Sequence, residues 1–397
     1  MLADLCRILL SSSDVTSGKH TKIRGTTMSF SRRQFVKGAM LAGAAAASPF
    51  YINKALAASK ELRIYAWAGY ITDEMLADFK EKTGINATFT PYGTNDELMN
   101  SLRATDGTGF DIIMPTVDRV PGYVDFDLVQ PLDTSRIKWN GCLDSAMSGS
   151  EVGGVVDGKR YFAPSDWGTE AISFHTEYAK VDPKNLSYGD LWNPEHDSGV
   201  AVRGHSALVG IGLWLEQQGK LPHPLLDSYK NEKAMRANFD VILKTAVKHK
   251  GMIAQFWSTE NEAQGAFRTN GAVIGQTWDS TAFNLMKEGE PIAYRAPKEG
   301  ALAWMEGFVI PKNANNVDAV YEFINWYYTP EAGAMFVEST GYNSTSKGAD
   351  ALLPEATKKF FQESYTEQDL KNLWWWPIQE PWYVALRNEY QDRYLSA

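Results

Sequence analysis

Apolar and polar positions alternate with the two-residue period of a β-strand near residue 62 and change to the period of a helix ten residues later. Residues 62–67 read Leu-Arg-Ile-Tyr-Ala-Trp, the alternation of a half-buried strand. Residues 72–80 carry apolar side chains at helical spacing, with Thr72 as N-cap before two acidic residues. A second strand over 86–90 comes after Gly84, a residue typical of helix ends. The order strand, helix, strand predicts an α/β sheet with mostly parallel strands.

The same alternation returns in the middle of the chain. A strand over 200–202 precedes a helix near 207–218, and a strand over 271–274 precedes a helix near 282–287. Two such stretches predict two α/β lobes with a cleft between them.

The predicted organisation has an export segment, two lobes and a helical C-terminal segment. We assign residues 1–57 to the export segment, residues 58–163 and 297–345 to lobe 1, residues 164–296 to lobe 2, and residues 346–397 to a helical segment that packs on the lobes.

The export segment carries a twin-arginine pattern. Ser31-Arg32-Arg33-Gln34-Phe35-Val36-Lys37 precedes an apolar, alanine-rich run over 38–47 and a small-residue cleavage site at 55–57. Translation starts at Met1 or at Met28, in which case residues 1–27 are an extension without a structural role. We expect the Tat export machinery to deliver a soluble protein to the periplasm.

Charge and composition exclude several classes of protein. The first 57 residues hold eight of the 39 basic and two of the 48 acidic residues, which leaves a body with 31 basic and 46 acidic residues and a net charge of −15. Such a body argues against a nucleic-acid partner and admits a cationic ligand. With 44% hydrophobic residues, the chain can bury a large core. Beyond the export segment no run is long and apolar enough to span a membrane.

Patterns for catalysis or metal binding are missing from the sequence. It has no Gly-x-Ser-x-Gly elbow, no His-Glu-x-x-His zinc motif and no glycine-rich phosphate loop. His196 and His205 have no carboxylate or cysteine at metal-ligand spacing, and Tyr327 and Tyr328 lie in a helical run that favours core packing. We expect no enzymatic activity, no cofactor and no metal. An exported enzyme and a metal receptor are the competing classes.

Tryptophans at the ends of predicted strands indicate a site for an organic cation. Trp67, Trp167 and Trp278 stand where a strand gives way to a loop. Ligands of α/β sheets bind at the carboxyl ends of strands, and each aromatic face attracts a cation by about 0.5–2 kcal/mol. Asp279 and Glu306 lie next to tryptophans in the sequence and can hold the charge through ionic hydrogen bonds.

Core packing is the competing interpretation for each tryptophan. We favour it for Trp192, Trp214 and Trp326, which lie in helix-like runs. For Asp279 and Glu306 the competing interpretation is a helix cap or a surface position.

Several motifs together resemble the spermidine/putrescine-binding periplasmic proteins. They are Ile64-Tyr65-Ala66-Trp67-Ala68-Gly69-Tyr70, Tyr161-Phe162-Ala163-Pro164-x-x-Trp167-Gly168-Thr169, Leu191-Trp192-Asn193-Pro194, Trp278-Asp279-Ser280-Thr281-Ala282-Phe283, Pro297-Lys298-Glu299-Gly300, Trp304-Met305-Glu306 and Gly341-Tyr342-Asn343. The resemblance covers most of the chain from about residue 60 to 350. It implies the type II periplasmic binding protein fold, in which each of two lobes is a mainly parallel sheet flanked by helices and the ligand lies in the cleft between the lobes. It also implies a monomeric solute receptor that delivers its ligand to ABC transporter permease subunits in the inner membrane.

The resemblance also implies site residues. Carried over by position, Trp67 and Tyr70 are aromatic contacts of the first lobe, Asp279 and Glu306 are the amine-binding acids, and Tyr342 is a contact from late in the chain. The full set of expected ligand contacts is Trp67, Tyr70, Thr116, Asp118, Trp167, Arg203, Trp257, Trp278, Asp279, Glu306 and Tyr342.

Two departures from the family pattern leave the ligand open. Ala68-Gly69 stands where the family often has an acid, and Arg203-Gly204-His205-Ser206 stands where it has an acidic stretch. A diamine needs a carboxylate at each end, because an unpaired buried ammonium is costly. One ligand class is therefore a polyamine such as putrescine or spermidine. The other is a small zwitterion such as a betaine, dimethylsulfoniopropionate or γ-aminobutyrate, whose carboxylate Arg203 would bind.

Overall fold

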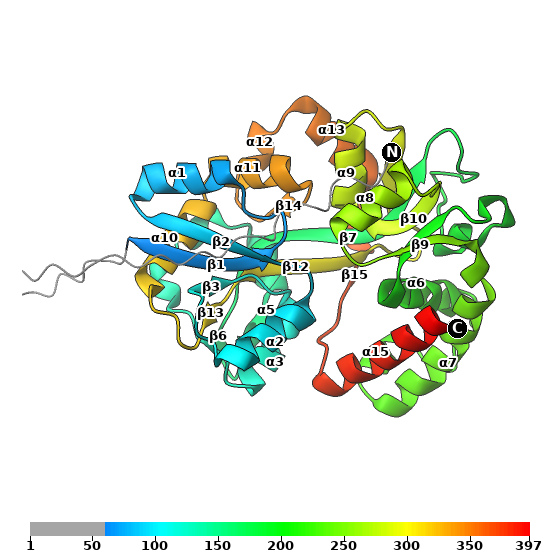
Figure 1. The fold of residues 1–397 in the computed structure, drawn as a ribbon, viewed down its shortest axis with the longest axis horizontal. Coiled ribbons are helices and arrows are strands. Elements are labelled where there is room, and N and C mark those ends of the chain that lie inside the picture. Colours follow the sequence, from blue (N-terminus) through cyan, green and yellow to red (C-terminus); the bar gives the residue numbers. More distant parts are fainter. Residues whose placement is uncertain (1–59) are drawn as a thin grey trace, which may run out of the picture. The chain divides into compact units, whose positions relative to one another are not determined.

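The computed structural model describes residues 60–397, so the twin-arginine signal predicted within residues 1–57 lies outside the described residues. The described chain has an α/β fold with two lobes, as the sequence predicts (Figure 1).

The first lobe is built on a parallel sheet with strand order β2-β1-β3. Strand β1 (Glu61–Trp67) leads through helix α1 (Asp73–Thr83) to β2 (Asn86–Tyr92), and helix α2 (Asn95–Thr105) leads on to β3 (Ile112–Ile113). The sequence-based boundaries hold at α1 because both ends are capped. Thr72 Oγ1 accepts a hydrogen bond from the Met75 amide at 3.2 Å, and Gly84 takes the left-handed conformation at φ 72°.

Helices from distant parts of the chain complete this lobe. They are η1 (Val117–Arg119), α3 (Val120–Asp125), α4 (Asp144–Gly149), α5 (Glu151–Gly154), α10 (Val317–Tyr327), α11 (Pro330–Thr340) and α12 (Ala349–Leu352), with the short strand pairs β4 (Val129–Gln130) with β13 (Ile310–Pro311) and β5 (Val155–Val156) with β6 (Lys159–Arg160). Tyr327 is fully buried among aromatic neighbours, in line with the core packing expected for it.

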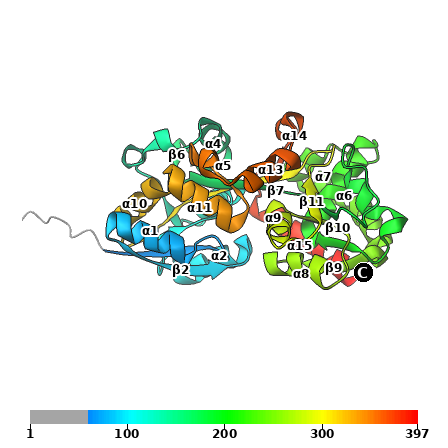
Figure 2. The ribbon, with the colours of Figure 1, turned by 90° about the horizontal axis from the view of Figure 1, so that it is seen from above.

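Two long strands connect the lobes. Strand β7 (Ala163–His175) contributes Ala163 to the hydrophobic core of the first lobe and Ile172 to that of the second. Its antiparallel partner β12 (Leu302–Phe308) runs the other way, with Leu302 in the second core and Phe308 in the first. Figure 2 shows β7 passing between the two groups of helices. The exact residue boundaries of the lobes stay a prediction.

The second lobe is built on the sheet that contains β7 and β12, whose strand order is β15-β12-β7-β10-β8-β9. Strands β8 (Val200–Arg203), β9 (Ile253–Trp257) and β10 (Ile274–Trp278) are parallel, and β10 pairs antiparallel with β7, so the sheet as a whole is mixed. Strands β11 (Ile292–Arg295) and β14 (Asn343–Ser344) also pair with β7. The main helices are α6 (Gly204–Gln217), α7 (Glu232–Lys248), α8 (Glu260–Arg268) and α9 (Asp279–Lys287).

The predicted boundaries shift around β10. The strand expected over 271–274 begins only at Ile274, because Gly271 adopts a left-handed turn conformation at φ 76°. The helix expected from residue 282 begins already at Asp279.

The C-terminal segment returns to the second lobe. After α13 (Glu355–Ser364) and α14 (Glu367–Lys371), strand β15 (Trp374–Trp375) pairs with β12, and helix α15 (Pro381–Ser396) packs on α6 and α7. Tyr383 and Tyr390 of α15 are buried in the second core. In the described part of the chain, no helix combines the length and the apolar character that crossing a membrane requires.

Candidate ligand-binding site

A cavity of about 330 Å³ lies where strands from both lobes end. Each of five strands contributes its last residue to the lining: Trp67 of β1, Tyr92 of β2, Arg203 of β8, Trp257 of β9 and Trp278 of β10. This is the place where α/β sheets bind ligands, and the volume falls in the range of small-molecule sites.

Nine of the eleven expected contacts line this cavity: Trp67, Tyr70, Thr116, Asp118, Arg203, Trp257, Trp278, Glu306 and Tyr342. Their role in binding a ligand stays a prediction.

Trp167 does not line the cavity, contrary to our expectation from the sequence. Successive side chains of a strand point to opposite faces, and the cavity-lining Glu170 lies three positions further along β7, on the other face. Trp167 packs instead against Tyr365 and Trp375, with ring centroids 6.3 and 6.4 Å away.

Asp279, the other expected contact that does not line the cavity, has a fully buried carboxylate. It accepts hydrogen bonds from the Tyr365 hydroxyl at 2.9 Å, the Ser280 amide at 3.1 Å and the Thr169 amide at 3.3 Å. Asp279 is the first residue of α9, and its carboxylate accepts from a backbone amide at the N-terminus of that helix, where negative charge is stabilising.

Aromatic rings form much of the cavity wall. The indole of Trp67 donates to the Met114 carbonyl at 3.1 Å and packs on Tyr92 at 4.9 Å between centroids. On another side, Tyr342 packs against Tyr70 at 5.6 Å and against Trp304 at 4.8 Å. Hydrogen bonds and ring packing therefore hold these faces in place before a ligand arrives.

Arg203 occupies part of the aromatic wall itself. Its guanidinium lies 4.9 Å from the ring centroid of Trp278 and 5.7 Å from that of Trp257. Glu170 is its acidic partner at 3.9 Å, and Ser206 also donates to Glu170 at 2.8 Å. Burial raises the pKa of Glu170 to about 7, against the opposing charge of Arg203.

Glu306 is the carboxylate with an unused hydrogen-bonding position. It is 3% exposed, and its Oε2 has no hydrogen-bond partner among residues 60–397. The indole nitrogen of Trp304, two residues earlier on β12, is likewise without a partner in the described chain. Burial raises the pKa of Glu306 well above its ordinary value, and the nearby Asp166 adds to this shift. A buried acceptor of this kind calls for a donor from a ligand.

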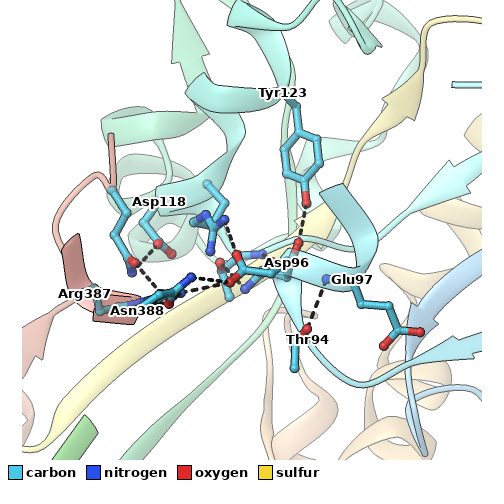
Figure 3. Close-up of polar contacts among 11 residues, drawn as sticks. Thr94, Asp96, Glu97, Asp118, Tyr123, Arg387 and Asn388 are labelled. Atoms are coloured by element: carbon cyan, nitrogen blue, oxygen red, sulfur yellow. Dashed lines mark hydrogen bonds and ion pairs between the residues drawn. The ribbon is translucent and has the colours of Figure 1, made fainter. Parts of the chain in front are cut away.

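Ion pairs and hydrogen bonds link several further lining residues in one network (Figure 3). Asp96 of α2 accepts from Arg119 at 2.7 Å and from Arg387 of α15 at 3.1 Å. Gln379 donates to Asp118 at 2.9 Å and accepts from Arg387 at 2.8 Å. Burial would raise the pKa of Asp96, but Arg387 and Arg119 lower it below the usual value. The C-terminal segment thus contacts the first lobe across the cavity.

Sequence reasoning missed several charged lining residues, among them Asp96, Glu170 and Arg387. The strand alternation of β7 is a signal that could have found Glu170. It puts residues 167 and 170 on opposite faces, so only one of the two can face the cavity. The partners Asp96 and Arg387 are 291 residues apart, and no spacing rule links them.

The histidines and acids of the described residues do not form a group of three that could hold a metal ion. His205 lines the cavity, and burial lowers its pKa well below the ordinary value, so it is uncharged there.

Two connected lobes around a cavity with aromatic and acidic walls define a small-molecule binding protein. The chain belongs to the bacterial extracellular solute-binding proteins, whose family profile matches residues 74–363.

Individual proteins that are similar to this chain are also solute-binding or receptor proteins by name. The chain is 26% identical to the spermidine/putrescine-binding periplasmic protein of Escherichia coli strain K12 over 325 aligned residues. The alignment covers 82% of this chain and 86% of that protein. The structure of a putative spermidine/putrescine ABC transporter protein from Listeria monocytogenes superposes with a TM-score of 0.71 at 23% identity, over 85% of this chain and 99% of the other. A GABA receptor shares the fold at a TM-score of 0.60 and 19% identity, over 84% of this chain and 96% of the other.

Proposed function

We propose that this protein is the periplasmic receptor of an ABC importer and that it binds a polyamine-like organic cation such as putrescine or spermidine. The observation that carries the proposal is the buried Oε2 of Glu306, which has no hydrogen-bond partner in the described part of the chain and lies in a cavity walled by Trp67, Tyr70 and Tyr342. An ammonium group at Glu306 would satisfy this oxygen and lie among aromatic faces, which attract cations.

The charge of the cavity supports a cationic ligand. Its lining contains five carboxylates and three arginines: Asp96, Asp118, Glu170, Glu260 and Glu306, with Arg119, Arg203 and Arg387. Asp96 is paired with two of the arginines and Glu170 with the third, which leaves the formal excess of negative charge near the remaining acids. The relative from E. coli, named for spermidine and putrescine, supports the same ligand class.

A zwitterion such as γ-aminobutyrate, dimethylsulfoniopropionate or a betaine is the second candidate, and Arg203 favours it. Arg203 lines the cavity at 17% side-chain exposure, and its ion pair with Glu170 is long at 3.9 Å. Its guanidinium can therefore donate two parallel hydrogen bonds to the carboxylate of a ligand. The cationic end of such a ligand would still lie at Glu306.

The proposed setting follows from the same family. We propose a periplasmic monomer, exported by the Tat machinery, that gives its ligand to permease subunits in the inner membrane and does no chemistry on it.

Isothermal calorimetry tests the proposal, on protein that has been partly unfolded and refolded to remove carried-over ligand. Putrescine, spermidine, γ-aminobutyrate, glycine betaine and dimethylsulfoniopropionate are the probes. Binding of the diamines alone supports the polyamine, and binding of a zwitterion alone supports the second candidate. No heat with any of the five would overturn both.

Three variants locate the site. We expect Glu306→Gln to abolish binding of the cationic probe, whereas Asp279→Asn, a buried acid outside the cavity, keeps it. Arg203→Glu removes the binding of γ-aminobutyrate if its carboxylate lies on Arg203. Unchanged affinity in Glu306→Gln would contradict the assignment.

A further inference from the structure

Glu306 has a second buried carboxylate directly beside it. Glu306 of β12 and Asp166 of β7 are register partners in the antiparallel pair, so both side chains point to the same face of the sheet. Asp166 is fully buried and Glu306 is 3% exposed. Each keeps one oxygen, Oδ2 and Oε2, without a hydrogen-bond partner in the described chain. Only Glu306 lines the cavity, so Asp166 lies behind it.

The groups around this acid pair do not supply a free compensating cation. Tyr70 lies near both carboxylates and lowers the pKa of each against the effect of burial, and Ser165 donates to Asp166 Oδ1. The charged or titratable groups that act on Glu306 come from several elements: Tyr70, Tyr92, Asp118, Asp166, Arg203, Tyr327 and Tyr342. The tyrosines are neutral, because burial raises the pKa of each well above 10. Arg203 is the cation among these groups, and it already pairs with Glu170.

Two ionised carboxylates at this position would repel each other without solvent to screen them. Burial raises the pKa of Asp166 to about 7, and it raises the pKa of Glu306 well above its ordinary value. The two groups therefore titrate as a coupled pair.

We propose that Glu306 and Asp166 hold one proton between them in the free receptor and that the ammonium group of the ligand displaces this proton. The acid O–H bond breaks, the proton leaves to solvent, and a ligand N–H donates to Glu306 Oε2, so the charge of the occupied site equals that of the protonated one. Glu306 touches the ligand, and Asp166 is a positioning residue that acts through Glu306. The inference rests on the proposed function, since it requires a ligand with an ammonium end.

The exchange restricts the ligand class. A primary or secondary ammonium carries N–H donors that replace the O–H of the acid, whereas a trimethylammonium or dimethylsulfonium head has none. Within both proposed classes, the pair therefore selects putrescine, spermidine or γ-aminobutyrate over glycine betaine and dimethylsulfoniopropionate.

Proton release on binding is the direct test. Putrescine and γ-aminobutyrate are titrated by calorimetry from pH 6 to 8, at each pH in two buffers of low and high ionisation enthalpy that both take up protons there: phosphate with ACES below about pH 7.4, and phosphate with Tris above it. We expect wild-type protein to release close to one proton per bound ligand near pH 6 and fewer as the pH rises. Asp166→Asn should shift the pH range of this release downward, because the carboxylate that adds to the raised pKa of Glu306 is then missing while burial still acts on it.

Glu299→Gln is the matched control, because Glu299 is also a buried acid, it accepts hydrogen bonds from Ser187 and the Tyr188 amide, and it lies outside the cavity. It should release protons as the wild type does. Binding without proton release in the wild type overturns the inference, and so does a pH profile of release in Asp166→Asn that matches that of the wild type.

A ligand-free measurement separates this inference from the proposed function if neither probe binds. Raised pKa values mean that the folded state binds more protons than the unfolded state, so the pair costs stability as the pH rises from 5 to 8. Asp166→Asn should therefore gain in melting temperature relative to wild type between pH 5 and pH 8. Glu306→Gln should show the same trend, which covers the case that Asp166→Asn does not fold. A difference that stays constant with pH in both variants overturns the inference.

Discussion

Gly168 of β7 shows how a single residue shapes the cavity wall. A Cβ atom at this position would lie 2.4 Å from Cζ2 of Trp304, the cross-strand partner whose ring lines the cavity. The missing side chain therefore makes the space in which the Trp304 indole lies.

We predict that Gly168→Ala destabilises the protein by about 1–3 kcal/mol, the usual cost of overpacking, and weakens binding of the cationic probe because Trp304 must move. Urea unfolding and calorimetry measure the two effects. Gly265→Ala in α8 is the control, since a Cβ there meets no atom within 4 Å and alanine favours helix. Equal stability of the two variants would contradict the prediction.

At the scale of elements, helix α15 packs on helices of the second lobe and makes polar contacts with the first lobe. Arg387 and Asn388 both donate to Asp96 of α2, at 3.1 and 3.4 Å. The pair is partly solvated, because the Asp96 side chain is 37% exposed, so screening reduces its contribution.

We predict that Asp96→Asn lowers the free energy of unfolding by about 1 kcal/mol at pH 7. The two arginines hold the folded-state pKa of Asp96 below its usual value, so this stabilisation is present above the unfolded pKa and is lost as the pH falls through the folded pKa. Urea unfolding from pH 7 down to pH 3 should therefore show the variant and the wild type converging. Asp144→Asn is the control, an acid of 91% side-chain exposure paired with Lys347, and it should change nothing measurable.

Elements whose ends carry local signals could be predicted from the sequence. The chain around Thr72 and Gly84 contains its own caps, so β1, α1 and β2 fall where the pattern puts them. Strand β15 could not be predicted, because Trp374 and Trp375 form a strand only through the edge of β12. A two-residue strand has no periodicity, and its partner lies far away in sequence.

At the scale of the whole described chain, strand ends account for part of the predicted lining. Trp67 and Trp278, which stand out in the sequence because a predicted strand ends there, do end strands and line the cavity. The burial of Asp279 could not be predicted, because one of its hydrogen bonds comes from Tyr365, in a segment whose return to the sheet no local pattern indicates.

Ligand binding should stabilise both lobes together. Strands β7 and β12 contribute side chains to both hydrophobic cores, and the cavity is lined from both lobes. We predict one unfolding transition in calorimetry, shifted upward by the bound probe, with about 2.7 kcal/mol of added stability at a ligand concentration 100 times the dissociation constant. Two transitions, only one of which shifts with the ligand, would contradict this prediction.

The return of residues 374–397 to β12 and α6 also fixes which part of the cavity wall is made last. A ribosome makes the chain from its N-terminus, so β12 has emerged long before its partner β15 and before Arg387 of α15. Until then, that edge of β12 lacks its neighbour and the cavity lacks the wall that Trp376 and Arg387 provide. Of the described cavity lining, the part that residues 376–395 contribute is therefore the last to be synthesised.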